Sequence, residues 1–534
     1  MDPSFRRVIV IFAVAMAMGY LIFSGVFSRA APLGGWQNQI FGQTAWSEWD
    51  PGGSYVDAAH QLTWGERPLF VGHPGTVLVL LLSSLQHVYF TVVGLDTGFS
   101  FTEFTARNLP TVFLLSKLMM TVLHLVACFV VYRLARRVLQ DERAAAFSAL
   151  GYATSLPVGY FLSRISVEPL VVIFFALSLL SLWRYQDFAA QNRLAEALRF
   201  AALAGVLSVS GLVTKLNFLA PLVPFLALYL SFQGRGDADS APISRRTRLL
   251  GLLAFASTAS LSLLLYSQFI DWQDFFGIWR TIAGLKSTAW SLTHFLPGLS
   301  PGRIFPLSEF VFVALGVFGL IAFLRANAGR RSRALWLSAF GLWSLLLFAF
   351  RIAKSADFLP FHYFNLSNVV VAVFFGHAIM LLLRRLRPAG LGSTKAVSGI
   401  LMVLLLHGMA FWTVFDSRYQ DTLRYAPSKE IHRAIAKLEP GQRFGCIQCR
   451  PLMDTRQRRL FPKWFFLTST GWTVRRNPAY HSRLTAEFES IFVSYDPGST
   501  DVLENAISLP ALMGKVVVID ESDAILSPQA ESHL

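Results

Sequence analysis

The stretch Trp46–Ser84 reads WSEWDPGGSYVDAAHQLTWGERPLFVGHPGTVLVLLLSS, and it separates two long apolar segments of the chain. It concentrates charged and histidine side chains that the apolar segments lack: Glu48, Asp50, Asp57, His60, Glu66, Arg67 and His73. Charged groups beside a membrane-embedded body are either solvated or line a site. We interpret residues 28–110 as one large outer loop that forms part of an active site.

The composition indicates a polytopic membrane protein. Of the 534 residues, 54% are hydrophobic and only 15% are charged, with a mean hydropathy of +0.49; soluble domains carry about 25% charged residues. The net charge of +15 is unevenly distributed, because residues 1–415 contain 32 basic and 18 acidic residues, whereas the remainder contains 15 and 14. The basic excess therefore reflects membrane topology, and no binding to nucleic acid is expected.

Twelve apolar segments approach the length of about 20 residues that a membrane-crossing helix needs. They are Val8–Phe27, Thr76–Leu95, Thr111–Tyr132, Ala144–Leu162, Val167–Trp183, Phe200–Val213, Leu216–Phe232, Leu249–Ile270, Phe310–Leu324, Ala334–Phe350, Leu366–Leu383 and Ala396–Phe415. We interpret the first as a retained span, because no convincing small-residue cleavage site accompanies it.

Basic residues between these segments predict the topology, since positively charged loops stay on the cytoplasmic side. Six clusters occur, at Arg6/Arg7, Arg133/Arg136/Arg137/Arg143, Arg184/Arg193/Arg199, Arg235/Arg245/Arg246/Arg248, Arg325/Arg330/Arg331/Arg333 and Arg384/Arg385/Arg387/Lys395. All six share one side only if Thr76–Leu95 does not cross completely. We therefore interpret Thr76–Leu95 as a juxtamembrane or re-entrant helix, which leaves about eleven transmembrane helices in residues 1–415.

The same topology places the tail, residues 416–534, outside the membrane. This tail loses the long apolar runs and gains a strand-like GKVVVID (Gly514–Asp520) and a helix-like APSKEIHRAIAKL (Ala426–Leu438). These patterns predict a small extracytoplasmic α/β domain. Its Cys446 and Cys449 form a CxxC motif, which we interpret as a structural disulfide or, alternatively, as half of a metal site.

Two carboxylates that the topology places outside are candidate catalytic residues. Asp50 precedes a Pro-Gly-Gly turn and suits a general base for an acceptor hydroxyl or amine, or a ligand of a divalent cation. Glu168, followed by Pro169 at a helix start, lies where one span ends and the next begins, and such a carboxylate is costly unless paired or functional. The alternatives are a solvated Asp50 and a salt bridge from Glu168 to Arg164.

Seven cationic groups on the outer side would suit a phosphate or pyrophosphate leaving group, which needs charge-assisted donors. They are Arg107, Lys215, Arg280, Lys286, Arg303, Lys354 and His362. Lys215 has no acidic neighbour in sequence, and its alternative role is snorkelling to the interface. Lys117 and His124 lie within a span, and we assign them to snorkelling and to packing. The absence of Walker, GxSxG, HExxH and dinucleotide motifs gives no support to ATP-driven transport or soluble-type hydrolase chemistry.

The order of these motifs resembles that of the GT-C membrane glycosyltransferases, in particular the protein mannosyltransferase and lipid A aminoarabinose transferase superfamily. The resemblance covers Val8–Phe415, and four segments carry it: Trp49–Leu82, Arg133–Leu179, Leu203–Pro224 and FHYFNL (Phe361–Leu366). The first is similar to the family's first outer loop, in which an acid precedes a Tyr, a small-residue helix and a His-Pro step into an apolar helix.

The resemblance implies a role for each candidate residue. Asp50 corresponds to the family's catalytic acid and Glu168 to a second acid, while Lys215 and His362 would contact the phosphate of the donor. The other expected substrate-binding residues are Tyr55, Asp57, His73, Arg107, Lys354 and Tyr363. Pro51 occupies the place of the usual acidic partner, and the wider spacing from Asp50 to Tyr55 leaves Asp50 and Asp57 as alternatives for the working acid.

The function that the resemblance implies is transfer of a sugar, with inversion, from a polyprenyl-phosphate carrier to a glycan, lipid or protein acceptor. The expected place is the outer, periplasmic or lumenal face of a lipid bilayer, with a bacterial plasma membrane favoured. No cofactor is expected other than an optional divalent metal ion. Two alternatives are a transporter or flippase of a lipid-linked or anionic substrate, which should carry its functional charges mid-bilayer, and a structural membrane protein whose tail binds a partner.

Overall fold

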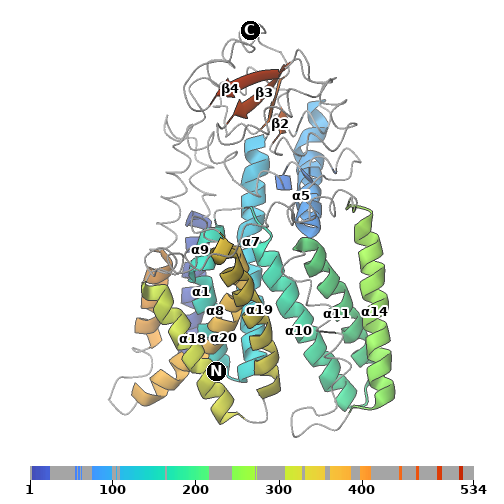
Figure 1. Cartoon of the computed structure of the whole chain (residues 1–534). Coiled ribbons are helices and arrows are strands. Elements are labelled where there is room, and N and C mark those ends of the chain that lie inside the picture. Colours follow the sequence, from blue (N-terminus) through green and yellow to red (C-terminus); the bar gives the residue numbers. More distant parts are fainter. Residues whose placement is uncertain are drawn as a thin grey trace.

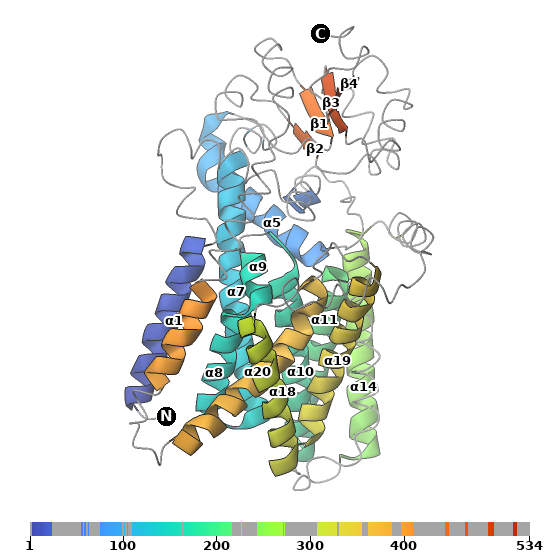
Figure 2. The same ribbon diagram turned by 60° about the vertical axis from the view of Figure 1, so that its left-hand side comes forward.

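A bundle of long helices and a small parallel sheet make up the described part of the computed structural model (Figure 1). The sheet lies beyond one end of the bundle (Figures 1 and 2). The structure describes residues 3–23, 55–56, 58–59, 62, 75–98, 101, 104, 109–162, 165–215, 226, 243–270, 272, 307–327, 331–354, 361–386, 397–409, 444–447, 465–467, 490–495 and 516–520.

Eleven labelled α-helices occur in these residues: α1 (Pro3–Phe23), α5 (Thr76–Tyr89), α7 (Leu109–Leu139), α8 (Glu142–Ala153), α9 (Leu156–Leu162), α10 (Glu168–Ala190), α11 (Leu194–Thr214), α14 (Arg245–Ser267), α18 (Leu307–Ala326), α19 (Arg331–Lys354) and α20 (Phe361–Leu386). Seven helical stretches in the described part are long and apolar enough to cross a membrane, and Ile9–Ile22, Arg333–Leu346 and Val397–Met409 are shorter apolar helices. The expected span Leu216–Phe232 lies outside the described residues except for Leu226. Eleven crossings therefore remain a prediction.

The described residues of the basic clusters lie at the end of the bundle that points away from the sheet. The turns from α7 to α8, from α10 to α11 and from α18 to α19 lie there, as do the starts of α1 and α14 and the end of α20 (Figures 1 and 2). The last turns of α7 and α20 each carry two arginines. This shared position is what the positive-inside interpretation requires, while the membrane face that each end meets stays a prediction.

Helix α5 lies beyond the ends of α10 and α11, on the side of the sheet (Figures 1 and 2). It continues through a π-helical turn, Phe90–Gly94, and a 3₁₀ turn, Leu95–Thr97, and it packs beside α7, whose N-terminal part projects from the bundle. Helices α1 and α7 run in opposite directions, so the basic clusters before and after α5 share one end. By length and hydropathy, however, Thr76–Thr97 is one of the seven stretches that could cross a membrane, so the re-entrant interpretation of Thr76–Leu95 stays a prediction.

Small residues bring α8, α18 and α20 into close contact. A Cβ atom on Gly376 of α20 would lie 2.1 Å from the Ala144 carbonyl of α8, and one on Gly319 of α18 would lie 2.0 Å from the Phe374 carbonyl of α20. The Ser148 hydroxyl also donates a hydrogen bond to the Val373 carbonyl, at 2.8 Å. Such close backbone approach is a common way for membrane helices to associate.

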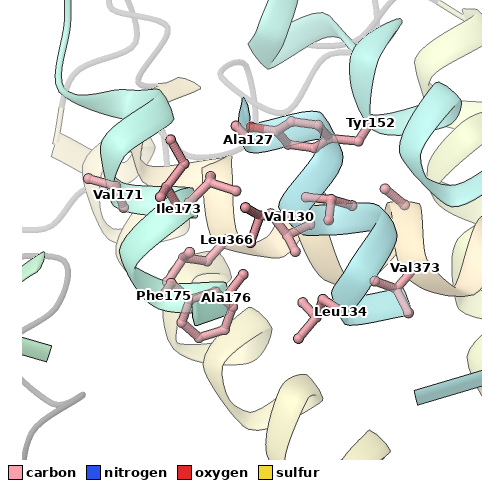
Figure 3. Close-up of a cluster of buried hydrophobic side chains, with 14 of the residues drawn as sticks. Ala127, Val130, Leu134, Tyr152, Val171, Ile173, Phe175, Ala176, Leu366 and Val373 are labelled. Carbon is pink, nitrogen blue, oxygen red and sulfur yellow. The ribbon is translucent and has the colours of Figure 1, made fainter. Parts of the chain in front are cut away.

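Large apolar side chains fill the space between α7, α10 and α20 (Figure 3). Val130 and Leu134 of α7 lie in the same buried cluster as Phe175 of α10 and as Leu366 and Val373 of α20. All five are less than a tenth exposed. These contacts fix the relative positions of the helices whose ends carry the candidate site.

The predicted span Ala144–Leu162 is wrong as one continuous helix, because the structure divides it into α8 and α9. Pro157 lacks the N–H that a continuing helix would need. The Thr154 hydroxyl donates to the Leu150 carbonyl at 2.9 Å, and the Ser155 hydroxyl donates to the Tyr152 carbonyl at 2.7 Å. The Leu150 and Tyr152 carbonyls also accept hydrogen bonds from the Thr154 and Ser155 amides, at 3.0 and 3.2 Å, so the two hydroxyls add second donors where the helix ends.

The sheet has four parallel strands in the order β2-β1-β3-β4. The strands are β1 (Phe444–Ile447), β2 (Phe465–Leu467), β3 (Ser490–Tyr495) and β4 (Val516–Asp520). The last lies within Gly514–Asp520, where the sequence predicts a strand. The predicted helix Ala426–Leu438 and Cys449 lie outside the described residues, so the α/β domain and the CxxC pairing stay predictions.

Candidate active site

Glu168 and Lys215 form a buried ion pair at the end of the bundle that faces the sheet. Glu168 begins α10, and Lys215 directly follows the last residue of α11. Because these consecutive helices are antiparallel, the start of one lies beside the end of the other. The Lys215 ammonium donates a hydrogen bond to Glu168 Oε1, and the two residues are 1% and 4% exposed.

This pairing decides the alternative that the sequence leaves open for Lys215. Lys215 does not snorkel to solvent, because it is buried and bound to a carboxylate from the neighbouring helix. The described partner of Glu168 is Lys215, whereas Arg164, the partner considered from the sequence, lies outside the described residues. A buried carboxylate at the membrane boundary is thus paired, as its cost demands.

Asn365 of α20 completes the environment of the Glu168 carboxylate. Its side-chain amide donates to Glu168 Oε2 at 3.2 Å and to the Glu168 main-chain carbonyl at 3.1 Å. Lys215 holds one carboxylate oxygen and Asn365 holds the other, so the carboxylate is fixed from two helices. The sequence interpretation missed Asn365 because it searched for charge. The sequence did contain a signal for this residue: Asn365 and Asn368 lie three residues apart in an otherwise apolar helix and therefore share one of its faces.

The described part of the first outer loop packs against α5. A Cβ atom on Gly75 would lie 2.1 Å from Tyr55 Cε1, and Gly75 has a φ of +54°. The side-chain amide of Gln86 in α5 donates to the Val56 carbonyl at 3.4 Å. Tyr55 is completely buried and begins a helical piece, as the sequence predicts. The ring and the glycine therefore fix the start of α5.

The start of α5 in turn lies beside the end of α11. Val77 packs against a buried cluster that contains Val209 and Val213. Val213 is two residues from Lys215, so the segment that begins α5 lies close to the ion pair. A loop that is distant in sequence is thus brought to the same end of the bundle as Glu168 and Lys215.

The structure describes few of the remaining predicted site residues. Asp50, Asp57, His73 and Arg107 lie outside the described residues, as do Arg280, Lys286 and Arg303. Lys354 ends α19, and His362 and Tyr363 lie in the first turn of α20, next to Asn365, but their side chains are outside the described part. The described residues contain no group of three or more metal-ligating His, Cys, Asp or Glu side chains, which leaves a metal site involving Asp50 untested.

Lys117 and His124 of α7 are both buried, each 2% exposed. Burial contradicts the snorkelling interpretation of Lys117. The His124 ring packs edge-on against the Tyr20 ring, with 6.3 Å between centroids, which agrees with a packing role for the histidine.

The fold is similar to that of solved membrane protein structures. No protein-family model matches the sequence, and no curated protein matches it. The structure is similar to ArnT from Cupriavidus metallidurans bound to undecaprenyl phosphate, with a TM-score of 0.53 and 13% identity over 96% of this chain and 89% of that chain. The apo state of ArnT gives a TM-score of 0.52 and 15% identity over the same shares. The protein has an ArnT-like fold.

A third structure, the apo oligosaccharyltransferase of Archaeoglobus fulgidus, gives a TM-score of 0.44 with 13% identity, over 91% of this chain and 67% of that chain. ArnT is a GT-C enzyme, so the resemblance that the sequence motifs carry is confirmed at the level of the fold. At 13–15% identity, this similarity concerns the fold and assigns no residue a role.

The ion pair constrains the chemistry that Glu168 can perform. Both of its carboxylate oxygens are engaged and shielded from water. A general base must reach the proton that it removes. The geometry thus shows Glu168 as the group that holds Lys215, while its role as a second catalytic acid stays a prediction.

Proposed function

We propose that this protein is an integral membrane glycosyltransferase of the GT-C type. In our proposal it moves a sugar from a polyprenyl-phosphate carrier to a glycan, lipid or protein acceptor. The observation that carries the proposal is the buried Lys215–Glu168–Asn365 centre at one end of a bundle with an ArnT-like fold. The polyprenyl donor is supported by the undecaprenyl phosphate bound in the similar ArnT structure.

The proposed reaction is a single displacement at the anomeric carbon. Asp50, with Asp57 as the alternative, removes the proton from the acceptor hydroxyl or amine. The acceptor atom attacks the anomeric carbon as its bond to the phosphate oxygen breaks, so the configuration inverts and the carrier leaves as a phosphate. Lys215 stabilises the charge that develops on that phosphate, and Glu168 keeps the ammonium in place. The other proposed substrate-binding residues are Tyr55, His73, Arg107, Lys354, His362 and Tyr363.

We place the reaction on the outer face of a bacterial plasma membrane. The Lys215–Glu168 pair lies at the end of the bundle opposite the basic clusters (Figures 1 and 2), which the positive-inside rule assigns to the cytoplasm. In this proposal residues 1–415 form the catalytic module. The proposal assigns residues 416–534 to an extracytoplasmic domain.

The test uses purified full-length protein in lipid with a panel of radiolabelled polyprenyl-phosphate sugars. Wild type should transfer label to an acceptor, and Asp50→Asn should lower the rate by at least about 100-fold, since general-base catalysis contributes about 10²–10⁴-fold. Asp96→Asn is the matched control, because Asp96 is an exposed carboxylate after α5. Loss of activity in Asp57→Asn with retention in Asp50→Asn would reassign the base. A folded wild type that transfers no sugar from any donor would refute the proposal.

The second candidate function is a flippase of lipid-linked or anionic substrates. The interruption between α8 and α9 favours it, because transporters build their sites on discontinuous membrane helices. A liposome assay with a fluorescent polyprenyl phosphate separates the two functions. Movement of the lipid across the bilayer without sugar transfer would support the flippase.

A further inference from the structure

Polar groups from two other helices surround the interruption between α8 and α9. Glu309, the third residue of α18, accepts a hydrogen bond from the Leu156 amide through Oε2, at 3.2 Å. Asn368 of α20 donates through Nδ2 to the Ser155 hydroxyl, at 2.8 Å. Because Ser155 and Leu156 are consecutive, the carboxylate and the amide meet at one point of the bundle.

Each of these side chains leaves one oxygen without a hydrogen bond. Glu309 Oε1 and Asn368 Oδ1 are buried and accept no hydrogen bond from the part of the chain that the structure describes. Both residues are 0% exposed. A buried hydrogen-bond acceptor without a partner is costly. Two such acceptors beside the same helix break therefore indicate a ligand that accepts electron pairs, such as a cation.

The buried Glu309 carboxylate must also be neutralised, either by a bound cation or by a proton. Among the described residues no Lys, Arg or His forms an ion pair with Glu309, in contrast to the pairing of Glu168 with Lys215. An isolated buried carboxylate is strongly disfavoured unless it is neutralised. The C-terminal end of α8, which is twelve residues long, directs the negative end of its helix dipole to the same place, where it opposes the positive end of α18, whose first turn contains Glu309.

We propose that Glu309, Asn368 and the C-terminal end of α8 bind a sodium ion. The available donors are hard oxygen atoms, which suit such cations and not soft metals. One carboxylate balances a single positive charge, whereas divalent cations usually recruit several carboxylates. Discontinuous membrane helices are known to coordinate sodium through the ends of their half-helices.

The site lies next to the candidate active site through α20. Asn365 and Asn368 are three residues apart and therefore share one face of that helix. Asn365 donates a hydrogen bond to Glu168, and Asn368 donates one to Ser155, between α8 and α9. A bound ion would connect α8, α18 and α20 within about one helical turn of the Lys215–Glu168 pair. The ion site does not depend on the proposed glycosyl transfer.

The test measures the melting temperature of the purified full-length protein by tryptophan fluorescence. NaCl is titrated against N-methyl-D-glucamine chloride at constant ionic strength, with LiCl, KCl and CaCl₂ in parallel. We expect a saturable rise in Tm with sodium in wild type, because a ligand that binds only the native state stabilises it. Glu309→Gln, which keeps an acceptor for the Leu156 amide, should lose that rise, whereas Glu196→Gln, at an exposed pair with Arg193, should retain it.

A gain-of-function variant covers the case in which Glu309→Gln does not fold. Asn368→Asp adds a second carboxylate at the ion site and should convert the sodium-dependent rise in Tm into a calcium-dependent one. Absence of any cation effect on wild type and on Asn368→Asp would overturn the proposal and leave Glu309 neutralised by its own proton. Equal sodium responses in wild type and Glu309→Gln would also overturn it.

Discussion

The buried Lys215–Glu168 pair makes a quantitative prediction about stability. In Lys215→Met the ammonium is lost while the carboxylate of Glu168, 4% exposed, stays buried with only Asn365 as a described donor. Removal of one partner from a buried ion pair costs about 3–5 kcal/mol. Solvent screening reduces this value little, because both side chains are shielded from water.

The double variant Glu168→Gln/Lys215→Met removes both charges. Replacing a buried ion pair by groups of similar volume is often neutral, and the Gln side chain can still accept from Asn365. We therefore expect the double variant to recover most of the stability that Lys215→Met loses. If Lys215 also contacts the donor phosphate, the double variant will be stable but will not transfer sugar, which separates the structural role from the functional one.

The assay is a denaturant titration of the purified protein followed through its 13 tryptophans. The exposed Arg193–Glu196 pair is the matched control, and Glu196→Gln should leave the unfolding midpoint unchanged. A loss below about 1 kcal/mol for Lys215→Met, well under the cost of breaking a buried pair, would refute the reasoning. A double variant less stable than the single one would refute it as well.

Three further predictions follow from the fold. Gly75→Ala should destabilise the protein by more than about 1 kcal/mol, from strain at positive φ and a clash with Tyr55, and its melting temperature should fall. Asn365→Leu should destabilise the protein by about 1–3 kcal/mol in the same titration, because the Glu168 carboxylate loses a donor. A cysteine at Asp96, in a cysteine-free background, should react with an impermeant maleimide from the outer side of intact cells; labelling only from the cytoplasmic side would show that α5 crosses the membrane.

Hydropathy predicted the helices well but not where they end. The expected span Thr111–Tyr132 corresponds to α7, which continues to Leu139, and Phe200–Val213 corresponds to α11, which begins at Leu194. Hydropathy marks the part of a helix that lipid can accept, whereas the hydrogen-bonded helix extends into the basic region. The interruption after α8 could have been predicted from Thr-Ser-Leu-Pro, since proline disfavours a helix before it.

The candidate site was only half predictable, for a physical reason. Charge distribution placed Glu168 and Lys215 at the same end of the bundle, which the structure confirms. Their contact depends on how α10 packs against α11, across a separation of 47 residues, and no sequence period reports that packing. Asn365 was not predicted because a neutral amide does not contribute to a count of charges, although burying an amide in an apolar helix is costly.

The two polar centres on α20 explain why an apolar helix carries two asparagines. Asn365 bonds to α10 and Asn368 bonds to the residues between α8 and α9, so α20 connects to both ends of the segment 155–168. That segment carries Glu168 at its end and therefore sets the position of Lys215. Close packing of Gly319 and Gly376 against neighbouring backbone prevents α20 from shifting. The position of the ammonium is thus determined by a closely packed group of helices, and the proposed transfer would use this preorganisation to stabilise the departing phosphate.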